Sequence, residues 1–296
     1  MEALHGLLVI DKPAGITSHD VVSAVRRLLH IQRVGHGGTL DPMATGVLVV
    51  LIGAATRLSQ FVVGHDKRYE AVIRLGISTT TYDAEGEVTG RRAVAVDEGE
   101  IHHALSHFEG EIAQVPPMYA AIKVDGRKLY DLARKGQEIA REPRPVTIHA
   151  LHVVQWAPPD LHIDVTCSAG TYIRSLAHDL GESLGCGAHL SRLRRTRSGP
   201  FSIDLSCSLD HLREHAERRT LSEVILPPAA ALQGMALVRL DPEQERDMRH
   251  GKQLALQTPE AASFLQARDA QDGLIGVLAR AEGNTWQPRI VLPPRD

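Results

Sequence analysis

The 296-residue sequence has few cysteines, no long apolar run and no signal-type N-terminus. Its cysteines, Cys167, Cys186 and Cys207, lie far apart and form no Cys-x-x-Cys pair, which argues against a disulfide framework and a zinc knuckle. The longest apolar stretch, residues 46–53, is well short of the roughly 20 residues that a membrane helix needs. These absences predict a cytoplasmic protein without a membrane segment.

Motifs for nucleotides and metals are missing as well. The sequence has no Gly-x-x-x-x-Gly-Lys-Ser/Thr and no Gly-x-Gly-x-x-Gly segment, so a nucleotide cofactor has no support. Among the 16 histidines, only His102, His103 and His107 stand at helical spacing, and they lack a His-Glu-x-x-His or matching cysteine pattern. We therefore expect neither a cofactor nor a metal.

The composition is that of a folded protein, with 43% hydrophobic and 23% charged residues. A net charge of −3 argues against a protein that coats nucleic acid indiscriminately. Positive charge is nevertheless concentrated in one run, Arg192, Arg194, Arg195 and Arg197. Such a run is more often a solvated face than a binding site, so a binding role needs support from the chemistry of neighbouring residues.

The length is at the upper edge of what one hydrophobic core supports, so we expect a large domain and a small one. A Pro- and Ala-rich connector at residues 226–231 precedes a tail with one helix and a terminal hairpin. We place a catalytic domain at residues 1–235 and a β-rich domain at residues 236–296.

Periodicity and turn signals predict most of the elements. A helix begins after Thr17, which forms a capping-box pattern with Asp20, and it ends near His30. A second helix starts after Gly170 and is capped by Gly185. The remaining expectations are strands at 5–11, 47–52, 69–77, 146–156 and 161–167, a loop at 34–46, helices at 101–108, 129–135 and 241–250, a turn at 123–127, and a hairpin of residues 274–281 and 286–292. Because hairpins outnumber crossovers, the sequence predicts an α+β fold on a largely antiparallel, mixed sheet flanked by helices.

The glycine-rich loop contains one acid, Asp41, between Leu40 and Pro42. A lone Asp-Pro is usually a tight turn. This loop is long, however, and leads into a buried strand, a position from which rigid sheets commonly present catalytic groups. A carboxylate there can act as nucleophile, base or metal ligand.

Five ordered segments carry a resemblance to a known family. They are residues 6–15 (GLLVIDKPAG), 36–46 (HGGTLDPMATG), 67–70 (KRYE), 115–119 (VPPMY) and 170–176 (GTYIRSL). Over residues 6–201 the chain resembles bacterial TruB-type tRNA pseudouridine synthases, and its tail is similar to the small β-rich PUA module that accompanies them. The resemblance implies isomerisation of the uridine at position 55, in the T arm of tRNA, to pseudouridine.

The resemblance also implies catalytic roles. Asp41 matches the essential aspartate, and glycal formation and direct attack on the ribose are both compatible with it. Tyr69 matches a residue that stacks on the flipped base, and its hydroxyl is placed for a late proton transfer. Arg174 matches an arginine that holds the catalytic carboxylate through two hydrogen bonds.

Further positions match substrate-binding residues of the family. His36 fills space among the extruded nucleotides, Asp83 is a partner for Arg174, and Leu193 is an apolar pocket wall. Tyr172 is matched too, and Lys12 supports the loop; we place Arg195 and Arg197 near RNA phosphate. Ala169 and Gly37 depart from the family pattern, in which many members carry Lys and Thr, and Ala169 puts one phosphate contact in doubt.

Two other functions compete with the synthase. One is a non-catalytic protein that binds or folds tRNA, in which Asp41 is incidental; the joint presence of Asp41, Tyr69 and Arg174 argues against it. The other is a metal-dependent hydrolase acting on RNA, which needs a ligand cluster that the sequence does not offer. The expected partner is the T arm of tRNA, with no membrane, no obligate protein partner and a monomeric state.

Overall fold

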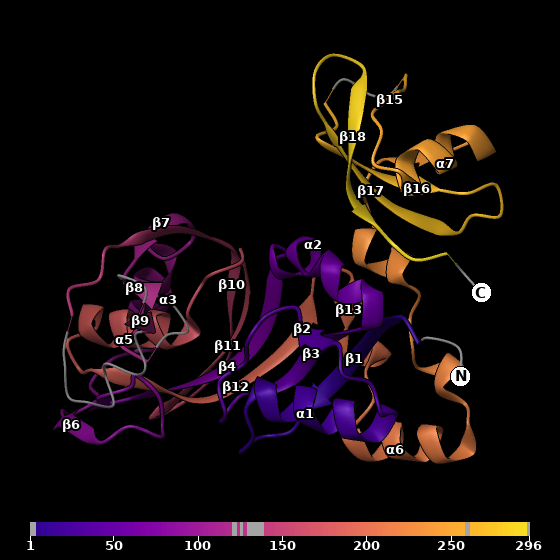
Figure 1. The fold of residues 1–296 in the computed structure, drawn as a ribbon. Helices are drawn as coiled ribbons and strands as arrows, with labels where there is room; N and C mark the ends of the chain where they lie inside the picture. The colour runs from indigo at the N-terminus through magenta and orange to yellow at the C-terminus, as the bar shows by residue number, and fades with distance from the viewer. Residues whose placement is uncertain (1–3, 120–122, 125–126, 129–138, 258–260, 295–296) are drawn as a thin grey trace.

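The computed structural model describes residues 4–119, 123–124, 127–128, 139–257 and 261–294. Two sheets organise them (Figure 1). The larger has nine strands, with β1-β3-β12-β4-β11-β10-β7 as its main order, β2 paired with β3, and β13 paired with β12. Its strands are β1 (Gly6–Lys12), β2 (Val34–His36), β3 (Thr45–Ile52), β4 (Lys67–Leu75), β7 (Gly110–Gln114), β10 (Arg144–Ala157), β11 (Asp160–Cys167), β12 (Ala188–Ser198) and β13 (Phe201–Ser202).

The second sheet lies in the C-terminal part of the chain, in the order β14-β16-β17-β18-β15. Its strands are β14 (Leu237–Arg239), β15 (Leu254–Ala255), β16 (Phe264–Arg268), β17 (Leu274–Arg280) and β18 (Thr285–Val291). Two short antiparallel pairs stand apart, β5 (Ile77–Thr79) with β6 (Val88–Arg91), and β8 (Lys123–Val124) with β9 (Arg127–Lys128). The large sheet is antiparallel except where β12 runs parallel to β3, so the predicted α+β fold, with a mixed, largely antiparallel sheet and a small C-terminal β domain, is confirmed.

Capping residues mark both ends of the first helix. Thr17 and Asp20 form the predicted capping box, and His30 ends the first helix in a left-handed conformation. Among the described residues no helix is long and apolar enough to cross a membrane. The α-helices are α1 (Ser18–Leu29), α2 (Ser59–Val63), α3 (Glu98–Ser106), α5 (Ile173–Ser183), α6 (Leu209–Arg218) and α7 (Pro242–Arg249), and the 3₁₀ turns are η1 (Gly53–Leu58), η2 (Ile203–Leu205), η3 (Leu221–Glu223) and η4 (Pro228–Leu232).

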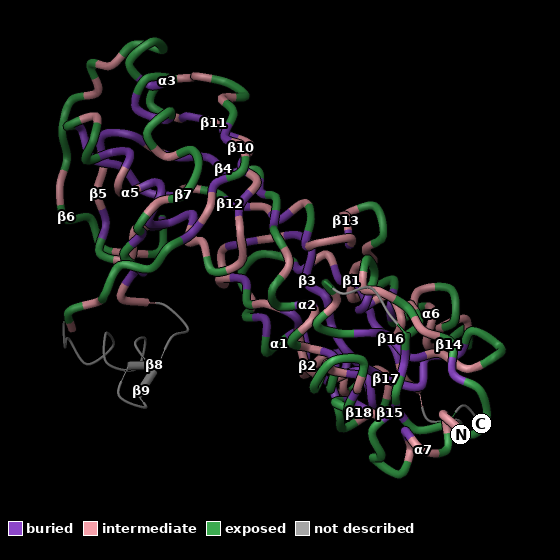
Figure 2. Tube along the Cα trace, turned by 90° about the horizontal axis from the view of Figure 1, so that it is seen from above, coloured by how far each residue is buried: buried purple, intermediate pink, exposed green. Residues whose placement is uncertain are grey.

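The core follows the alternation of the strands. In β1 and β3, one set of side chains packs with α1 and α5 in the main cluster, and the other packs with η1, α2 and η4. Strands β1, β3 and β17 are mostly buried, while β7, β10 and β18 are mostly half-buried or exposed (Figure 2). A separate cluster, which includes Leu240, Met248 and Trp286, forms the core of the second sheet.

Three expectations differ from the structure or fall, in part or in full, outside its described residues. Residues 34–46 were expected to be all loop, but Val34–His36 forms β2 because its backbone pairs with the exposed edge of β3. The turn predicted at 123–127 lies between the paired strands β8 and β9, and its residues 125–126 are outside the described part of the chain. The helix predicted at 129–135 is also outside it.

Candidate active site

The loop that carries Asp41 connects β2 to β3 and is fixed from several sides. Ser18, at the start of α1, is buried; its Oγ donates to Leu40 O at 3.1 Å and accepts from Leu40 N at 2.8 Å. Pro42 O accepts from Gly15 N at 2.9 Å and from Lys12 Nζ at 3.2 Å. These bonds hold both neighbours of Asp41, so the backbone that presents its carboxylate is rigid.

Arg174, the second residue of α5, links two carboxylates. Its Nε lies 2.9 Å from Asp41 Oδ2, and its Nη2 donates to Asp41 Oδ1 at 3.0 Å. On the other side, its Nη1 lies 3.4 Å from Asp83 Oδ2. The side chain is only 4% exposed and also donates to the carbonyls of Thr81 and Tyr119. Because a planar guanidinium contacts both oxygens of one carboxylate, Arg174 fixes the orientation of Asp41.

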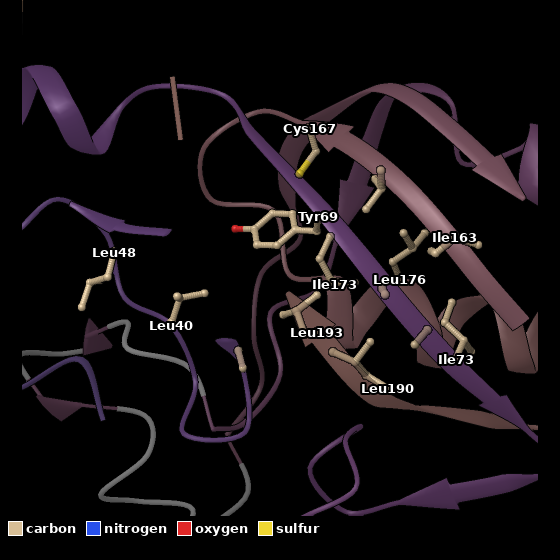
Figure 3. Packing of buried hydrophobic residues seen from close by; sticks show 14 of the residues in the cluster. Leu40, Leu48, Tyr69, Ile73, Ile163, Cys167, Ile173, Leu176, Leu190 and Leu193 are labelled. Atoms are coloured by element: carbon tan, nitrogen blue, oxygen red, sulfur yellow. The ribbon is translucent and has the colours of Figure 1, made fainter. Parts of the chain in front are cut away.

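Asp41 and Arg174 line a cavity of 290 Å³, close to the lower size of ordinary small-molecule sites. Tyr69 on β4 and Leu193 on β12 form part of its wall. Figure 3 shows the Tyr69 ring near Ile173 and Leu193, with its hydroxyl pointing away from the packed group of Ile73, Ile163 and Leu176. The cavity therefore offers an aromatic face, an apolar wall and a carboxylate to one planar ligand.

Burial controls the protonation of these groups. It raises the pKa of the Asp41 carboxyl above its ordinary value; the charge of Arg174 opposes this and that of Asp83 adds to it. Burial also raises the pKa of the Tyr69 hydroxyl, against the neighbouring Arg195 charge, so that Tyr69 is neutral at pH 7. Lys67, which also lines the cavity, has its pKa lowered by burial to about 8.

The structure brings together most of the residues that the sequence singled out. Asp41, Tyr69, Arg174, Tyr172 and Leu193 line the same cavity, although they come from four separate segments of the chain. Tyr172 is the N-cap residue of α5 and immediately precedes Ile173 in the wall.

Four predicted site residues lie outside the cavity wall: His36, Asp83, Lys12 and Arg197. His36 is half-buried on β2, where its Nδ1 accepts a hydrogen bond from Gly38 N at 3.4 Å. Burial, with a contribution from the Arg195 charge, lowers the pKa of His36. Asp83 lies behind Arg174, where it accepts from Thr81 Oγ1 and from Glu85 N. His36 is thus adjacent to the cavity, and Asp83 touches it only through Arg174.

Lys12 and Arg195 both donate to backbone carbonyls around the Asp41 loop. Arg195 is 2% exposed and donates to the carbonyls of Val47, Thr39 and Gly38 at 2.7, 3.3 and 3.1 Å. Lys12 is fully buried, and burial lowers its pKa to about 8. Both side chains support this loop through backbone carbonyls, and Arg195 also lines the cavity that contains Asp41.

The other arginines of the basic run are oriented differently. Arg192 and Arg197 are exposed, whereas Arg194 forms an ion pair with Asp11, its Nη2 lying 2.8 Å from Asp11 Oδ2. Register shifts between Leu190 and Arg192 and between Arg195 and Arg197 break the simple alternation of β12. As a result, Arg195 points inward, and Arg197 stays available to an anion.

This difference predicts opposite phenotypes for two neighbouring arginines. Arg197→Gln is expected to lower the log–log salt slope of RNA binding by about one while the rate at saturating RNA persists. Arg195→Gln leaves three carbonyls without their donor, at a cost of about 1–3 kcal/mol for each that stays buried, so we expect lower thermal stability and a lower saturating rate.

Salt titrations of binding, thermal melts and single-turnover rates check this pair. Arg218→Gln, on the exposed face of α6, is the matched control for loss of one arginine. Equal loss of rate in the Arg195 and Arg197 variants would contradict the assignment.

Two residues of this region were missed from the sequence. Gln114 is 2% exposed; its Oε1 accepts from Tyr172 N at 2.8 Å and its Nε2 donates to Tyr172 O at 3.0 Å, which anchors the start of α5. Nothing in the sequence around Gln114 indicates this contact. Lys67 stands in a quoted segment, but its role was not recognised; its Nζ donates to Val63 O at 2.6 Å and to His65 O.

The two departures from the family pattern lie beside the site. Ala169 is in the cavity wall, where its methyl group offers no charge to a phosphate. A Cβ at Gly37 would lie 2.4 Å from Val62 Cγ1, so Val62 occupies the space that a larger side chain would need. Within the described residues, no three His, Cys, Asp or Glu side chains gather into a possible metal site.

The fold is shared with chains of two solved complexes, one of which was solved with a substrate RNA. The chain is similar to a chain in "Crystal Structure of a Cbf5-Nop10-Gar1 Complex", with a TM-score of 0.77, 28% identity, and coverage of 98% of this chain and 85% of the other. It is also similar to a chain in "Structure of H/ACA RNP bound to a substrate RNA containing 2'-deoxyuridine", with a TM-score of 0.75, 27% identity, and coverage of 98% and 86%.

Comparisons of sequence define the class. A family model described as "TruB family pseudouridylate synthase (N terminal domain)" matches residues 26–173, and one described as "tRNA pseudouridylate synthase B C-terminal domain" matches residues 174–233. The protein is therefore a pseudouridylate synthase by class.

Proteins of similar sequence narrow the class of this protein to one family. tRNA pseudouridine synthase B of Burkholderia pseudomallei (strain 668) is 46% identical over 296 residues, covering 98% of each chain. The protein of that name from Pseudomonas aeruginosa (strain UCBPP-PA14) is 43% identical, covering 97% of this chain and 95% of the other. The chain belongs to the TruB family.

Proposed function

We propose that this protein converts the uridine at position 55, in the T arm of tRNA, to pseudouridine, with Asp41 as the reacting carboxylate and without a cofactor. The observation that carries the proposal is the ion pair of the buried Arg174 with the half-buried Asp41, which lies in a cavity walled by Tyr69 and Leu193. In a TruB-family chain, this is the arrangement that a flipped uridine needs. The names of the similar bacterial proteins support tRNA as the substrate.

The proposed reaction begins with extrusion of the uridine from the stack, because its glycosidic bond is out of reach inside a folded T arm. Unstacking costs a few kcal/mol, and the ring of Tyr69 and the side chain of Leu193 compensate by enclosing the uracil. The Asp41 carboxylate then attacks the ribose or removes a proton from it, and the bond between ribose C1′ and uracil N1 breaks. After the uracil has rotated, its C5 forms the new bond to C1′ and Asp41 departs unchanged; C5 then loses its proton, and N1 gains one, so the product is an isomer of uridine.

Arg174 and the Tyr69 hydroxyl have distinct proposed roles. Arg174 touches the reacting carboxylate and holds both its oxygens, so that one lone pair is aimed into the cavity. The Tyr69 hydroxyl is neutral at pH 7 because burial raises its pKa, and it is therefore able to relay the proton lost from C5, accepting it at the oxygen while giving up its own. His36 lies at the edge of the site, where it fills space among the extruded nucleotides.

We further propose a division between chemistry at residues 1–235 and RNA binding at residues 236–296. The five-stranded C-terminal sheet has its own core around Trp286. It is not isolated, since Phe61 of α2 and Phe264 of β16 meet edge to face at 5.4 Å and Arg57 donates to Val291 O. We propose a PUA-like, RNA-binding role for this sheet, and a cytoplasmic monomer that needs no protein partner.

One assay separates the synthase from a protein that only binds tRNA. A T-arm hairpin is incubated with the purified protein in excess chelator, and pseudouridine is mapped along the RNA. We expect product at position 55 alone, because Asp41 chemistry needs no metal. A second hairpin with cytidine at that position is the control. Tight binding without product would instead support the non-catalytic alternative, and product that requires metal would overturn the proposed chemistry.

A further inference from the structure

The loop that joins β5 to β6 carries a strained residue next to the site. Tyr82 has a φ of +63°, a left-handed conformation that aromatic side chains seldom adopt and that costs on the order of 1–2 kcal/mol. Its ring stacks on His178 of α5, with centroids 3.9 Å apart and planes at 8°. Figure 2 shows β5 beside α5 at this end of the molecule. The unfavourable backbone conformation is therefore balanced by a side-chain contact with a rigid helix.

Backbone bonds connect the same loop to β12. Leu190 N donates to Tyr82 O at 2.9 Å, and Ala84 N donates to Leu190 O at 3.0 Å. Asp83 lies between these two bonded residues and pairs with Leu190 as an isolated bridge. The left-handed turn at Tyr82 thus sets the direction in which the next side chain, that of Asp83, leaves the backbone.

Asp83 and the stack meet the same face of α5. Residues four apart on a helix are neighbours on its surface, and Arg174 and His178 have this spacing. Arg174 receives the Asp83 carboxylate at 3.4 Å, and His178 receives the Tyr82 ring one turn further along. The helix therefore holds the loop at two adjacent points, of which only the first touches the carboxylates of the site.

His178 lies away from the Asp41 cavity and, together with Tyr82, lines a separate cavity of 480 Å³. Its Nδ1 is buried without a hydrogen-bond partner, and neither it nor Tyr82 lines the cavity that contains Asp41. A buried imidazole nitrogen without a partner is costly. The His178 imidazole ring provides the flat surface on which the Tyr82 ring stacks.

We propose that the Tyr82–His178 stack is a positioning element that places Asp83 against Arg174, and through Arg174 sets the orientation of Asp41. The inference rests on the proposed function, because it assigns both residues to the orientation of the reacting carboxylate. Without the stack, the Tyr82 backbone is free to relax from its left-handed conformation, and Asp83 moves with it. Arg174 would then keep Asp41 as a partner but lose the second carboxylate that fixes its plane.

The test compares His178→Ala with His178→Phe in the full chain. His178→Ala is expected to lower the saturating rate about tenfold with KM nearly unchanged, because the reacting group is misaligned while RNA contacts persist. His178→Phe keeps a flat ring for stacking and should recover most of the rate. His211→Ala, at an exposed position on α6, controls for loss of a histidine.

A double-mutant cycle with Asp83→Asn separates positioning from general stability. If the stack acts through Asp83, His178→Ala has little further effect on the rate once Asp83 is Asn. Additive losses, or an undiminished rate in folded His178→Ala, would overturn the proposal. Equal rates in the Ala and Phe variants would overturn it too.

Hydrogen exchange provides a readout that does not depend on turnover. The amides of Ala84 and Glu85 donate to Leu190 O and to Asp83 Oδ1. We expect faster exchange of both in His178→Ala and wild-type exchange in His178→Phe, without RNA. If the wild type makes no pseudouridine but these amides respond as expected, the proposed function fails while the stack still positions the loop. If the amides do not respond, the stack does not position the loop, whatever the activity.

Discussion

Replacing Asp41 with Asn is expected to lower the single-turnover rate by at least about 10³-fold while tRNA binding stays within a few-fold of wild type. The substitution preserves the size and planarity of the side chain, and the loop bonds at Leu40 and Pro42 do not involve the carboxylate. What is lost is the charged oxygen that reacts with the ribose. The amide also offers Arg174 a single acceptor oxygen in place of two.

Single-turnover formation of pseudouridine at saturating RNA measures this loss, and filter binding measures the affinity. Asp210→Asn, on the exposed surface of α6, is the matched control and should behave as wild type. A thermal melt establishes that the Asp41→Asn protein is folded. Readily detected turnover by a protein preparation free of wild type would refute the assignment of Asp41.

The pH profile of the wild type provides an independent check. Asp41 reacts as the carboxylate, and burial raises its pKa above the ordinary value of about 3.9 for aspartate. The acidic limb of kcat/KM, which reports groups of the free enzyme, should therefore lie above that value. A limb at the ordinary pKa would show that the carboxylate titrates as if it were in water.

Elements with local signals were predicted well from the sequence. The helix α1 depends on the capping box of Thr17 and Asp20 and on apolar residues at helical spacing, all within one short segment. The terminal hairpin likewise follows from two apolar runs around a turn, and the structure has β17 and β18 there. In both cases the information that determines the element lies inside the element.

The central strand β12 was harder to interpret. Its four arginines made it look like a solvated basic run, yet it occupies the middle of the large sheet, between β3 and β4. Two register shifts turn Arg195 inward, where the backbone carbonyls of Gly38 and Val47 accept hydrogen bonds from its guanidinium. Because these acceptors belong to residues 38–47, no sequence pattern within residues 188–198 indicates them.

The site itself was predicted through the family resemblance, not from residue patterns. Without it, Tyr69 reads as an ordinary strand aromatic and Arg174 as a surface arginine. The structure places both at the cavity of Asp41, and it places Asp83 against Arg174 as expected. Gln114 could not be found in this way, since its contact with the Tyr172 backbone depends on how β7 meets α5 in three dimensions.

The contact between the two sheets changes how their separate roles must be tested. Leu274, Val277 and Ile290 pack into the same apolar cluster as Leu58 and Val62 of the first domain. Removing the chain from about Leu240 onward would expose this cluster to water, so a loss of activity after truncation would not distinguish lost RNA binding from lost stability. Substitutions at exposed positions of the C-terminal sheet avoid this problem.

Arg174→Lys is expected to lower the single-turnover rate about 100-fold, because an ammonium keeps the charge but cannot contact both oxygens of Asp41 and reach Asp83 as well. KM should change little, since the Tyr69 and Leu193 side chains that enclose the base are not disturbed. Arg213→Lys, in an exposed ion pair on α6, is the matched control. A wild-type rate in the Lys variant would show that charge alone is sufficient and that the bidentate geometry is unimportant.

Arg174→Met should lower the stability of the fold more than Arg174→Lys does. It leaves the carboxylates of Asp41 and Asp83 without the buried charge that compensates them, which should lower the free energy of unfolding by about 3–5 kcal/mol. The loss should depend on pH. The Arg174 charge opposes the rise of the Asp41 pKa, so removing it raises this pKa further above the unfolded value. Between those two values the folded variant binds a proton that the unfolded chain does not, and its stability therefore falls as pH rises. Urea unfolding should accordingly show a smaller deficit relative to wild type near pH 4 than at pH 7. An equal deficit at both would mean that Arg174 stabilises the fold through packing alone and does not act on the Asp41 charge.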